Sequence, residues 1–180
     1  MKFKVIRKQN NSRDCIVCGT RNKSGLNAKF YECLEVDAEG NVTENPVLVT
    51  IFRTEFHHQS YPGRTHGGIT GALIDEAVGR SVSIPLPHAW GVTMTLSVRY
   101  IKPVPLEEEL YAVTKTTKLT SRVFEGEGGV YDKDGTLLAT CEGRYLKLNP
   151  EQISPDGITE ENWFYVDEDL PEFIVIGGKE

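Results

Sequence analysis

One long helical pattern, flanked by segments typical of β-strands, limits the folds that this chain can adopt. Residues 66–84 follow the helical period, and Pro85 and Pro87 end the pattern. The predicted strands cover residues 27–37, 46–56, 90–101, 108–118, 122–131 and 136–148. Short turns between consecutive strands favour antiparallel pairing. We therefore expect an α+β fold in which one helix covers a mostly antiparallel sheet of about six strands.

The domain organisation follows from where these patterns begin and end. We expect an irregular lead-in over residues 1–26, one folded domain over residues 27–149, and an acidic tail with aromatic clusters over residues 150–180. The chain has 180 residues, of which 39% are hydrophobic, enough for a single well-packed core.

The charge distribution and the apolar runs constrain partners and location. The formal net charge is −6, with acids and bases mixed along the chain, which argues against a dedicated nucleic-acid binder. No apolar run has the length needed to cross a bilayer, and the first 14 residues lack the apolar core of a signal peptide. We expect a cytoplasmic protein with neither nucleic acid nor a membrane as partner.

Four cysteines, Cys15, Cys18, Cys33 and Cys141, raise the question of metal or redox chemistry. A four-cysteine zinc site would need a second close pair, which is absent from the sequence. A thioredoxin-like role needs a strand before the pair and a helix after it, whereas GTRNKSGLN is typical of a loop. We therefore interpret Cys15 and Cys18 as part of a reduced, structural turn.

The predicted helix has two different faces when its residues are placed at 100° steps. The stripe expected to pack on the sheet comprises Ile69, Leu73, Ala77 and Ile84. The neighbours of Asp75 on the opposite face are Gly68, Gly71, Gly79 and Val82. Because each helical glycine costs about 1 kcal/mol, we expect a second copy of the helix or a ligand to approach this face closely. Glu76 and Arg80, on the flank, are expected to form an exposed ion pair.

Residues 90–101 show the clearest strand pattern. Apolar residues at positions 92, 94, 96, 98 and 100 alternate with polar residues at positions 93, 95, 97 and 99, which predicts a long, half-buried strand. Trp90, Met94 and Phe56 suggest an apolar or aromatic pocket on the helix side. The polar face, with Thr95, Ser97 and Arg99, faces either solvent or a second dimer.

The start of the helix and its acid are candidates for acyl-transfer chemistry. Amides at a helix start have no internal acceptor, so Gly67 and Gly68 could hold a carbonyl oxygen that gains charge, although simple helix capping also explains them. Asp75 could activate water, attack directly, or serve as a structural acid. Gly67 and Asp75 lie about 12 Å apart along the helix, too far to contact one carbonyl. Two antiparallel helices, packed on their glycine faces, would combine Gly67 of one chain with Asp75 of the other in a homodimer.

Three segments together carry a family resemblance. The segments His66-Gly67-Gly68, Ala72-Leu73-Ile74-Asp75 and GVTMTLSVRYIKPVP resemble the hotdog-fold acyl-CoA thioesterases of the phenylacetate-pathway (PaaI) type. That family has a histidine and two glycines, an acid nine residues after the histidine, and a strand that ends at Y-x-(K/R)-P. The segment CIVCGTRNKSGLNAKF is also similar to the start of some members. The resemblance covers residues 15–148 and implies a hotdog fold, in which the sheet wraps around a long central helix.

The resemblance implies a catalytic role for four positions. The Gly67 amide would polarise the thioester carbonyl, and Asp75 would orient or deprotonate water, or act as the nucleophile. Thr93 would hold the water, and His66 would shape the loop. Glu76, beside Asp75, is the less favoured acid because it lies off the glycine face. No metal or organic cofactor is implied, since coenzyme A is part of the substrate.

Substrate contacts are implied at a second set of positions. These are Gly68, Ser60, Arg64, Ser121 and Arg122. Ser60 falls near a loop position that carries asparagine in some relatives, while Arg122 and Arg64 are candidates for the phosphates of coenzyme A. A metal site of His57, His58 and His66 is disfavoured, because adjacent side chains of an extended segment point to opposite sides.

The hypothesis is thus a cytoplasmic, homodimeric acyl-CoA thioester hydrolase, with a dimer of dimers left open. Two alternatives remain. One is a hotdog protein that binds acyl-CoA without turnover, as a sensor or regulator. The other is a structural dimer module that engages a partner through its tail.

Overall fold

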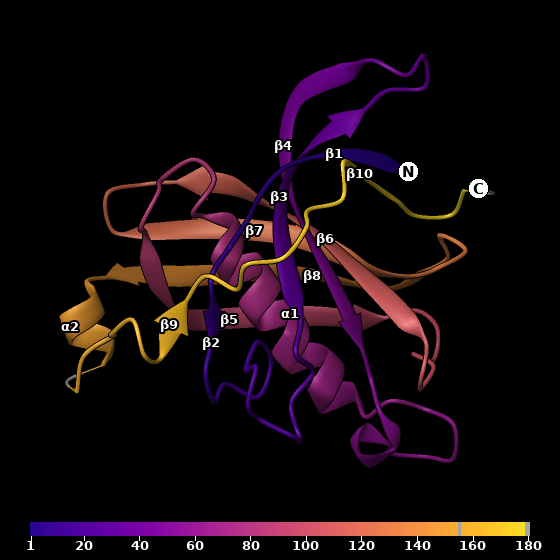
Figure 1. The fold of residues 1–180 in the computed structure, drawn as a ribbon, viewed down its shortest axis with the longest axis horizontal. Coiled ribbons are helices and arrows are strands. Elements are labelled where there is room, and N and C mark those ends of the chain that lie inside the picture. The colour runs from indigo at the N-terminus through magenta and orange to yellow at the C-terminus, as the bar shows by residue number, and fades with distance from the viewer. Residues whose placement is uncertain (155, 179–180) are drawn as a thin grey trace.

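An eight-stranded antiparallel sheet wraps around helix α1 (Gly67–Ser81) in the computed structural model, which describes residues 1–154 and 156–178 (Figure 1). The strands of this sheet are β1 (Lys2–Lys8), β3 (Lys29–Val36), β4 (Val42–Arg53), β5 (Trp90–Tyr100), β6 (Glu109–Leu119), β7 (Val123–Asp132), β8 (Leu137–Leu148) and β10 (Phe173–Val175). Their order is β10-β1-β3-β4-β6-β7-β8-β5. The expected α+β fold is confirmed, although the sheet has more than about six strands.

Four short elements complete the described part of the chain. Strands β2 (Asn11–Ser12) and β9 (Trp163–Phe164) form a separate two-stranded sheet. The 3₁₀ turn η1 (Phe56–His58) precedes the loop before α1, and α2 (Pro150–Ile153) follows β8. None of the helices described is long and apolar enough to cross a membrane.

The two additional strands of the main sheet come from the two ends of the chain. We expected residues 1–26 to be irregular, but β1 pairs with β3 on one side and β10 on the other. The physical reason lies in the start of the sequence, where Phe3 and Val5 alternate with lysines and are buried in an outer core cluster. Ile174 and Ile176 join the same cluster, so the C-terminal segment crosses the molecule and returns to β1 (Figure 1).

Helix α1 packs into the main core through a wider stripe than the sequence predicted. Leu73 and Ala77 are buried as expected, and Ile74 and Val78 are buried beside them. Ile69 and the more distant Ile84 are only partly buried at the margin of this core. The helix ends at Ser81 and not near residue 84, because a turn occupies the residues before the prolines.

Strand β5 contains a β-bulge that changes which side chains face the helix. Thr93 pairs with Tyr145, and Thr95 pairs with the next residue along β8, Arg144, so Met94 is an extra residue. The helix side of β5 beyond the bulge carries Leu96, Val98 and Tyr100. Thr93 also faces α1, where it bonds to a side chain of the helix. The predicted uninterrupted alternation over residues 90–101 is therefore wrong at Met94.

Candidate active site

Two hydroxyl groups hold the carboxylate of Asp75 on the side of α1 that faces β5 and β8. The Thr93 hydroxyl donates to it and lies 2.8 Å from Oδ1 and 3.0 Å from Oδ2. The Tyr145 hydroxyl lies 3.1 Å from Oδ1 and 3.0 Å from the Asp75 carbonyl oxygen. Burial and the neighbouring Asp75 charge raise the pKa of Tyr145, so its hydroxyl remains a donor. The two hydroxyls therefore fix the orientation of the Asp75 carboxylate.

Tyr145 is the residue of this group that sequence reasoning missed. Its ring is 2% exposed and is stacked on Phe124, with the ring centroids 4.9 Å apart. A tyrosine at a core position of a strand needs a partner for its hydroxyl, and this requirement was the available signal. The sequence alone does not indicate that the partner is Asp75.

The start of α1 leaves one backbone donor unused. His66 is the N-cap residue, and its Nδ1 accepts a hydrogen bond of 2.9 Å from the Gly68 amide. Among the described residues, the Gly67 amide has no acceptor, while the Gly67 carbonyl accepts from the Tyr100 hydroxyl at 2.7 Å. Gly67, and not Gly68, therefore offers a donor to a ligand, and the dipole of α1 adds to its attraction for a negative oxygen.

Gly67 and Asp75 line two different cavities. Asp75 and Thr93 line a cavity of about 530 Å³, together with Trp90. Gly67 lines a second cavity of about 430 Å³ that also contains Ser60 and Arg64. The predicted site residues are thus brought together in two groups within one chain.

Other predicted contacts lie away from both groups. Ser121 and Arg122 are exposed in the turn between β6 and β7 and line neither cavity, nor a third one of about 910 Å³ that contains no residue of α1. Met94 and Phe56, expected beside Trp90 in an apolar pocket, are both exposed and line none of these cavities.

Tyrosines of the same chain cover the glycine face of α1. The Tyr100 ring lies against Gly67 and Gly71, where an added Cβ would be 3.5 and 3.6 Å from its nearest atoms. The Tyr145 ring approaches Gly79 in the same way, at 3.3 Å. The expected close approach is real, but these side chains account for it without a second helix.

Glu76 and Arg80 form a buried ion pair, so the expectation of an exposed pair is wrong. Arg80 Nη2 lies 2.7 Å from Glu76 Oε1, and the Arg80 side chain is only 9% exposed. Its guanidinium also donates to the Asn10 carbonyl at 2.8 Å and stacks between Phe30 and Trp163. The pair faces the N-terminal segment, whose ordered course the sequence pattern did not reveal.

Two groups of side chains, one of histidines and one containing two cysteines, contain atoms that could bind a metal. The three histidines do not converge: His58 Nδ1 accepts from the Glu55 amide, and His66 Nδ1 accepts from Gly68. Within residues 1–154 and 156–178, a single group of three potential ligand atoms lies within 4.8 Å of one another, at Cys15, Cys18 and Glu76. Both thiols are free, and the Arg80 guanidinium already donates into this group.

Comparisons with known proteins show similarity to one family over part of the chain. Residues 62–139 match the Thioesterase superfamily. An uncharacterized protein of Schizosaccharomyces pombe is 32% identical over 98 residues, which cover 51% of this chain and 56% of that protein. The acyl-coenzyme A thioesterase THEM4 of Bos taurus is 30% identical over 109 residues, 59% of this chain and 43% of that protein. The chain thus spans about half the length of these relatives.

Solved structures agree with this match. The thioesterase superfamily protein RHA08564 has a TM-score of 0.56 and 26% identity, over 74% of this chain and 63% of that one. The BH2602 protein of Bacillus halodurans, solved with CoA, has a TM-score of 0.51 and 29% identity, over 55% and 70% of the two chains. Zebra fish thioesterase superfamily member 2, at 17% identity and a TM-score of 0.53, is alike in fold. The chain therefore has the fold of solved thioesterase superfamily proteins, and its residues 62–139 are similar to the Thioesterase superfamily.

Proposed function

We propose that this protein is an acyl-CoA thioester hydrolase that uses Asp75 to activate water. The observation that carries the proposal is the Asp75 carboxylate, which Thr93 and Tyr145 orient on the wall of an open cavity. The substrate class is supported by the similarity to a bovine acyl-coenzyme A thioesterase and to a bacterial protein solved with CoA.

In the proposed reaction, Asp75 acts as a general base. Its carboxylate takes a proton from water, and the oxygen of that water attacks the thioester carbonyl carbon. The carbonyl oxygen becomes negative and accepts a hydrogen bond from the Gly67 amide at the start of a helix. The C–S bond then breaks, and the coenzyme A thiolate recovers the proton from Asp75. Direct attack by Asp75 would instead form a mixed anhydride and release the coenzyme A thiolate. Water attack on the Asp75 carbonyl of that anhydride, in a single turnover in ¹⁸O-water, would then label the Asp75 carboxylate and not the product acid.

We further propose that each site is shared by two subunits of a homodimer. Gly67 and Asp75 lie in separate cavities of one chain. Strand β5 is a free edge of the sheet, and the exposed Val92 and Met94 leave it apolar. Pairing of two β5 strands about a two-fold axis would set two α1 helices side by side and antiparallel on one sheet face. Gly67 of one subunit would then approach Asp75 of the other.

The proposed contacts with coenzyme A depend on the position of Gly67. Arg64 and Ser60 border the cavity beside Gly67, which suits them to the phosphates or pantetheine of coenzyme A. Ser121 and Arg122 are exposed but line neither cavity, so their contact with the same ligand stays a prediction. A dimer of dimers and a cytoplasmic location stay predictions.

Thiol release from a panel of acyl-CoA esters tests the proposed activity. The wild-type protein should release coenzyme A from at least one ester, and Asp75→Asn should lower kcat at least about 100-fold, because the base is lost. The isosteric amide can still accept from Thr93, so the fold should be retained in circular dichroism. Saturable binding without thiol release would instead identify an acyl-CoA-binding protein, and neither binding nor release would identify a structural module.

A further inference from the structure

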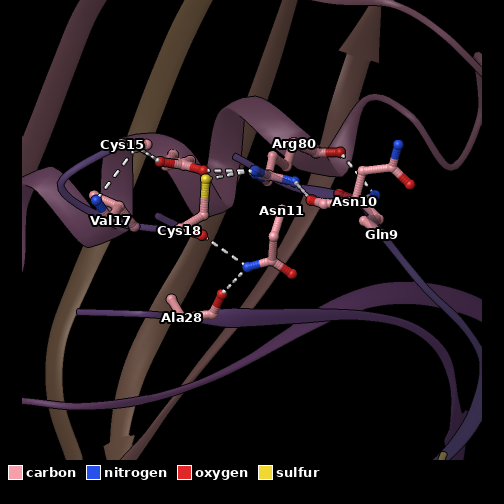
Figure 2. Close-up of polar contacts among 9 residues, drawn as sticks. Gln9, Asn10, Asn11, Cys15, Val17, Cys18, Ala28 and Arg80 are labelled. Carbon is pink, nitrogen blue, oxygen red and sulfur yellow. Dashed lines mark hydrogen bonds and ion pairs between the residues drawn. The ribbon is translucent and has the colours of Figure 1, made fainter. Parts of the chain in front are cut away.

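The segment between β2 and β3 holds Cys15 and Cys18 on one tight turn (Figure 2). The Gly19 amide donates to the Cys15 carbonyl at 2.9 Å, and a Cβ on Gly19 would lie 2.2 Å from that oxygen, so only glycine fits. The Asn11 side-chain amide fixes the other end, donating to the Cys18 carbonyl at 2.8 Å and to the Ala28 carbonyl at 3.1 Å. The turn therefore presents both sulfurs to the same side, within 4.8 Å of one another.

The two thiols have different surroundings. Both cysteines line the cavity that contains Asp75, but Cys15 is half-buried whereas Cys18 is only 1% exposed. The Cys15 thiol donates to Glu76 Oε2 at 3.2 Å, and the Cys15 sulfur accepts a hydrogen bond of 3.3 Å from the Val17 amide. Hydrogen bonding by Cys18 lowers the pKa of Cys15 to about 7 against the opposing effects of burial and the Glu76 charge, while the bond to Cys15 and burial raise the pKa of Cys18. The accessible sulfur is thus the one that ionises first.

A guanidinium balances the negative charge of this group. Arg80 donates to the Cys18 sulfur at 3.1 Å and from Nε to Glu76 Oε1 at 2.8 Å. A structural zinc site has four ligands, whereas this group offers three, and the arginine already supplies the cation. The contacts favour thiol chemistry over metal binding.

We propose that Cys15 and Cys18 form a redox-active dithiol that closes to a disulfide by exchange with a low-molecular-weight disulfide. The Cys15 thiolate attacks one sulfur of glutathione disulfide, forming a mixed disulfide and releasing one glutathione thiolate. That thiolate takes the proton of Cys18, whose sulfur then attacks the Cys15 sulfur and releases the second glutathione. The protein loses two electrons and two protons, and glutathione disulfide is reduced to two thiols. The proposal does not depend on the hydrolase activity.

The decisive experiment equilibrates the full chain with graded ratios of reduced to oxidised glutathione, alkylates the remaining thiols, and maps the cysteines by mass spectrometry. We expect a Cys15–Cys18 disulfide whose fraction rises with the oxidised share. Cys33 and Cys141, which are buried and have pKa values raised to about 12, serve as internal controls and should stay reduced.

Two single variants identify the attacking sulfur. Cys18→Ser should accumulate a stable glutathione adduct on Cys15, because no second thiol resolves it. Cys15→Ser should form no adduct on the buried Cys18. The proposal is overturned if both thiols of the folded wild-type chain remain alkylatable at the most oxidising ratio. It is also overturned if the purified chain holds one zinc ion that Cys15→Ser releases.

Discussion

At the residue scale, the hydroxyl of Tyr145 is predicted to support Asp75. Tyr145→Phe removes the bond to the carboxylate but keeps the ring that stacks on Phe124. We expect a loss of about 1–2 kcal/mol in the free energy of unfolding. We also expect kcat to fall about tenfold, because the less firmly oriented carboxylate should raise the activation free energy by a comparable amount, about 1.4 kcal/mol. Urea denaturation and thiol-release assays measure the two effects. Tyr131→Phe is the matched control, because the Tyr131 hydroxyl makes no hydrogen bond within the described residues, and equal losses in both variants would contradict the prediction.

The pH dependence of Cys15 alkylation is a second prediction at this scale. The thiolate is the reactive form, and hydrogen bonding lowers the pKa of Cys15 to about 7. The rate with iodoacetamide should therefore be half-maximal at about pH 7, reach its plateau above about pH 8, and fall about tenfold per pH unit below about pH 6. The titratable and charged groups in and around this cavity are Arg7, Lys8, Cys18, Glu32, Asp75, Glu76, Arg80, His88 and Tyr145.

A variant without the thiol donor tests the cause of that shift. Cys18→Ala removes the strongest donor to the Cys15 sulfur, so the midpoint should move toward the ordinary value of about 8.5. An unchanged midpoint in Cys18→Ala, or a wild-type midpoint already at the ordinary value, would show that the Cys18 thiol does not control Cys15.

Single residues also show how far sequence reasoning could reach. Asp75 was selected by its place on the glycine face of the helix and then by the family resemblance. Thr93 was selected by the resemblance alone, although the alternation of residues 90–101 placed it on the face away from the helix. The bulge at Met94 resolves this conflict, since it brings Thr93 to the same side as Tyr100. A bulge depends on the register with a neighbouring strand, which one strand's own pattern does not encode.

At the scale of elements, the helix and the inner strands were predictable because each has a strong periodic pattern. Strand β1 was missed because its alternation of lysines and apolar residues covers only residues 2–5, and the pairing with β3 shifts between Val5 and Arg7. The burial of the Arg80 side chain was also missed. The helix pattern alone marks this residue as exposed, and the N-terminal segment covers it only in three dimensions.

Breaking the buried pair of α1 should therefore destabilise the fold far more than breaking a surface pair. Arg80→Met keeps apolar contact with Phe30 and Trp163 but leaves the Glu76 carboxylate, 20% exposed, without its cation. We expect a loss of about 2–3 kcal/mol in the free energy of unfolding, measured by urea denaturation. Arg53→Met, which breaks an exposed pair with Glu55, should lose less than about 1 kcal/mol. A similar loss in both variants would mean that the Glu76–Arg80 pair contributes no more than a surface pair.

At the scale of the whole molecule, the exposed edge strand β5 predicts that two copies of the chain associate. Met94 is 52% exposed in the chain, and pairing of two β5 strands would bring its side chain close to the partner. Met94→Lys should leave the fold intact and weaken the dimer at least about tenfold, because like charges meet across a two-fold axis. Sedimentation equilibrium measures the dissociation constant. Val42→Lys, 48% exposed on β4, is the control, and an equal effect there would refute pairing through β5.

Mixing two inactive variants tests whether one site draws on both subunits. Gly67→Pro removes the amide hydrogen and should keep the start of the helix, because proline suits the first position of a helix. His66 precedes it with φ −63° and ψ 132°, the extended conformation that proline favours in its neighbour. The homodimers of Gly67→Pro and of Asp75→Asn should each lose about 100-fold or more in kcat, while Gly67→Ala, which keeps the amide, should stay active.

Refolding the two inactive chains together at equal concentration should then restore about a quarter of the wild-type activity, since half of the dimers are mixed and each mixed dimer has one intact site. If each site instead lay within one chain, every site in the mixture would carry a lesion, and activity would stay at the level of the parents. The same mixture with Met94→Lys added to both chains should lose the restored activity at protein concentrations below its dissociation constant. Recovered activity therefore requires that the Gly67 amide and the Asp75 carboxylate act on one carbonyl from opposite subunits.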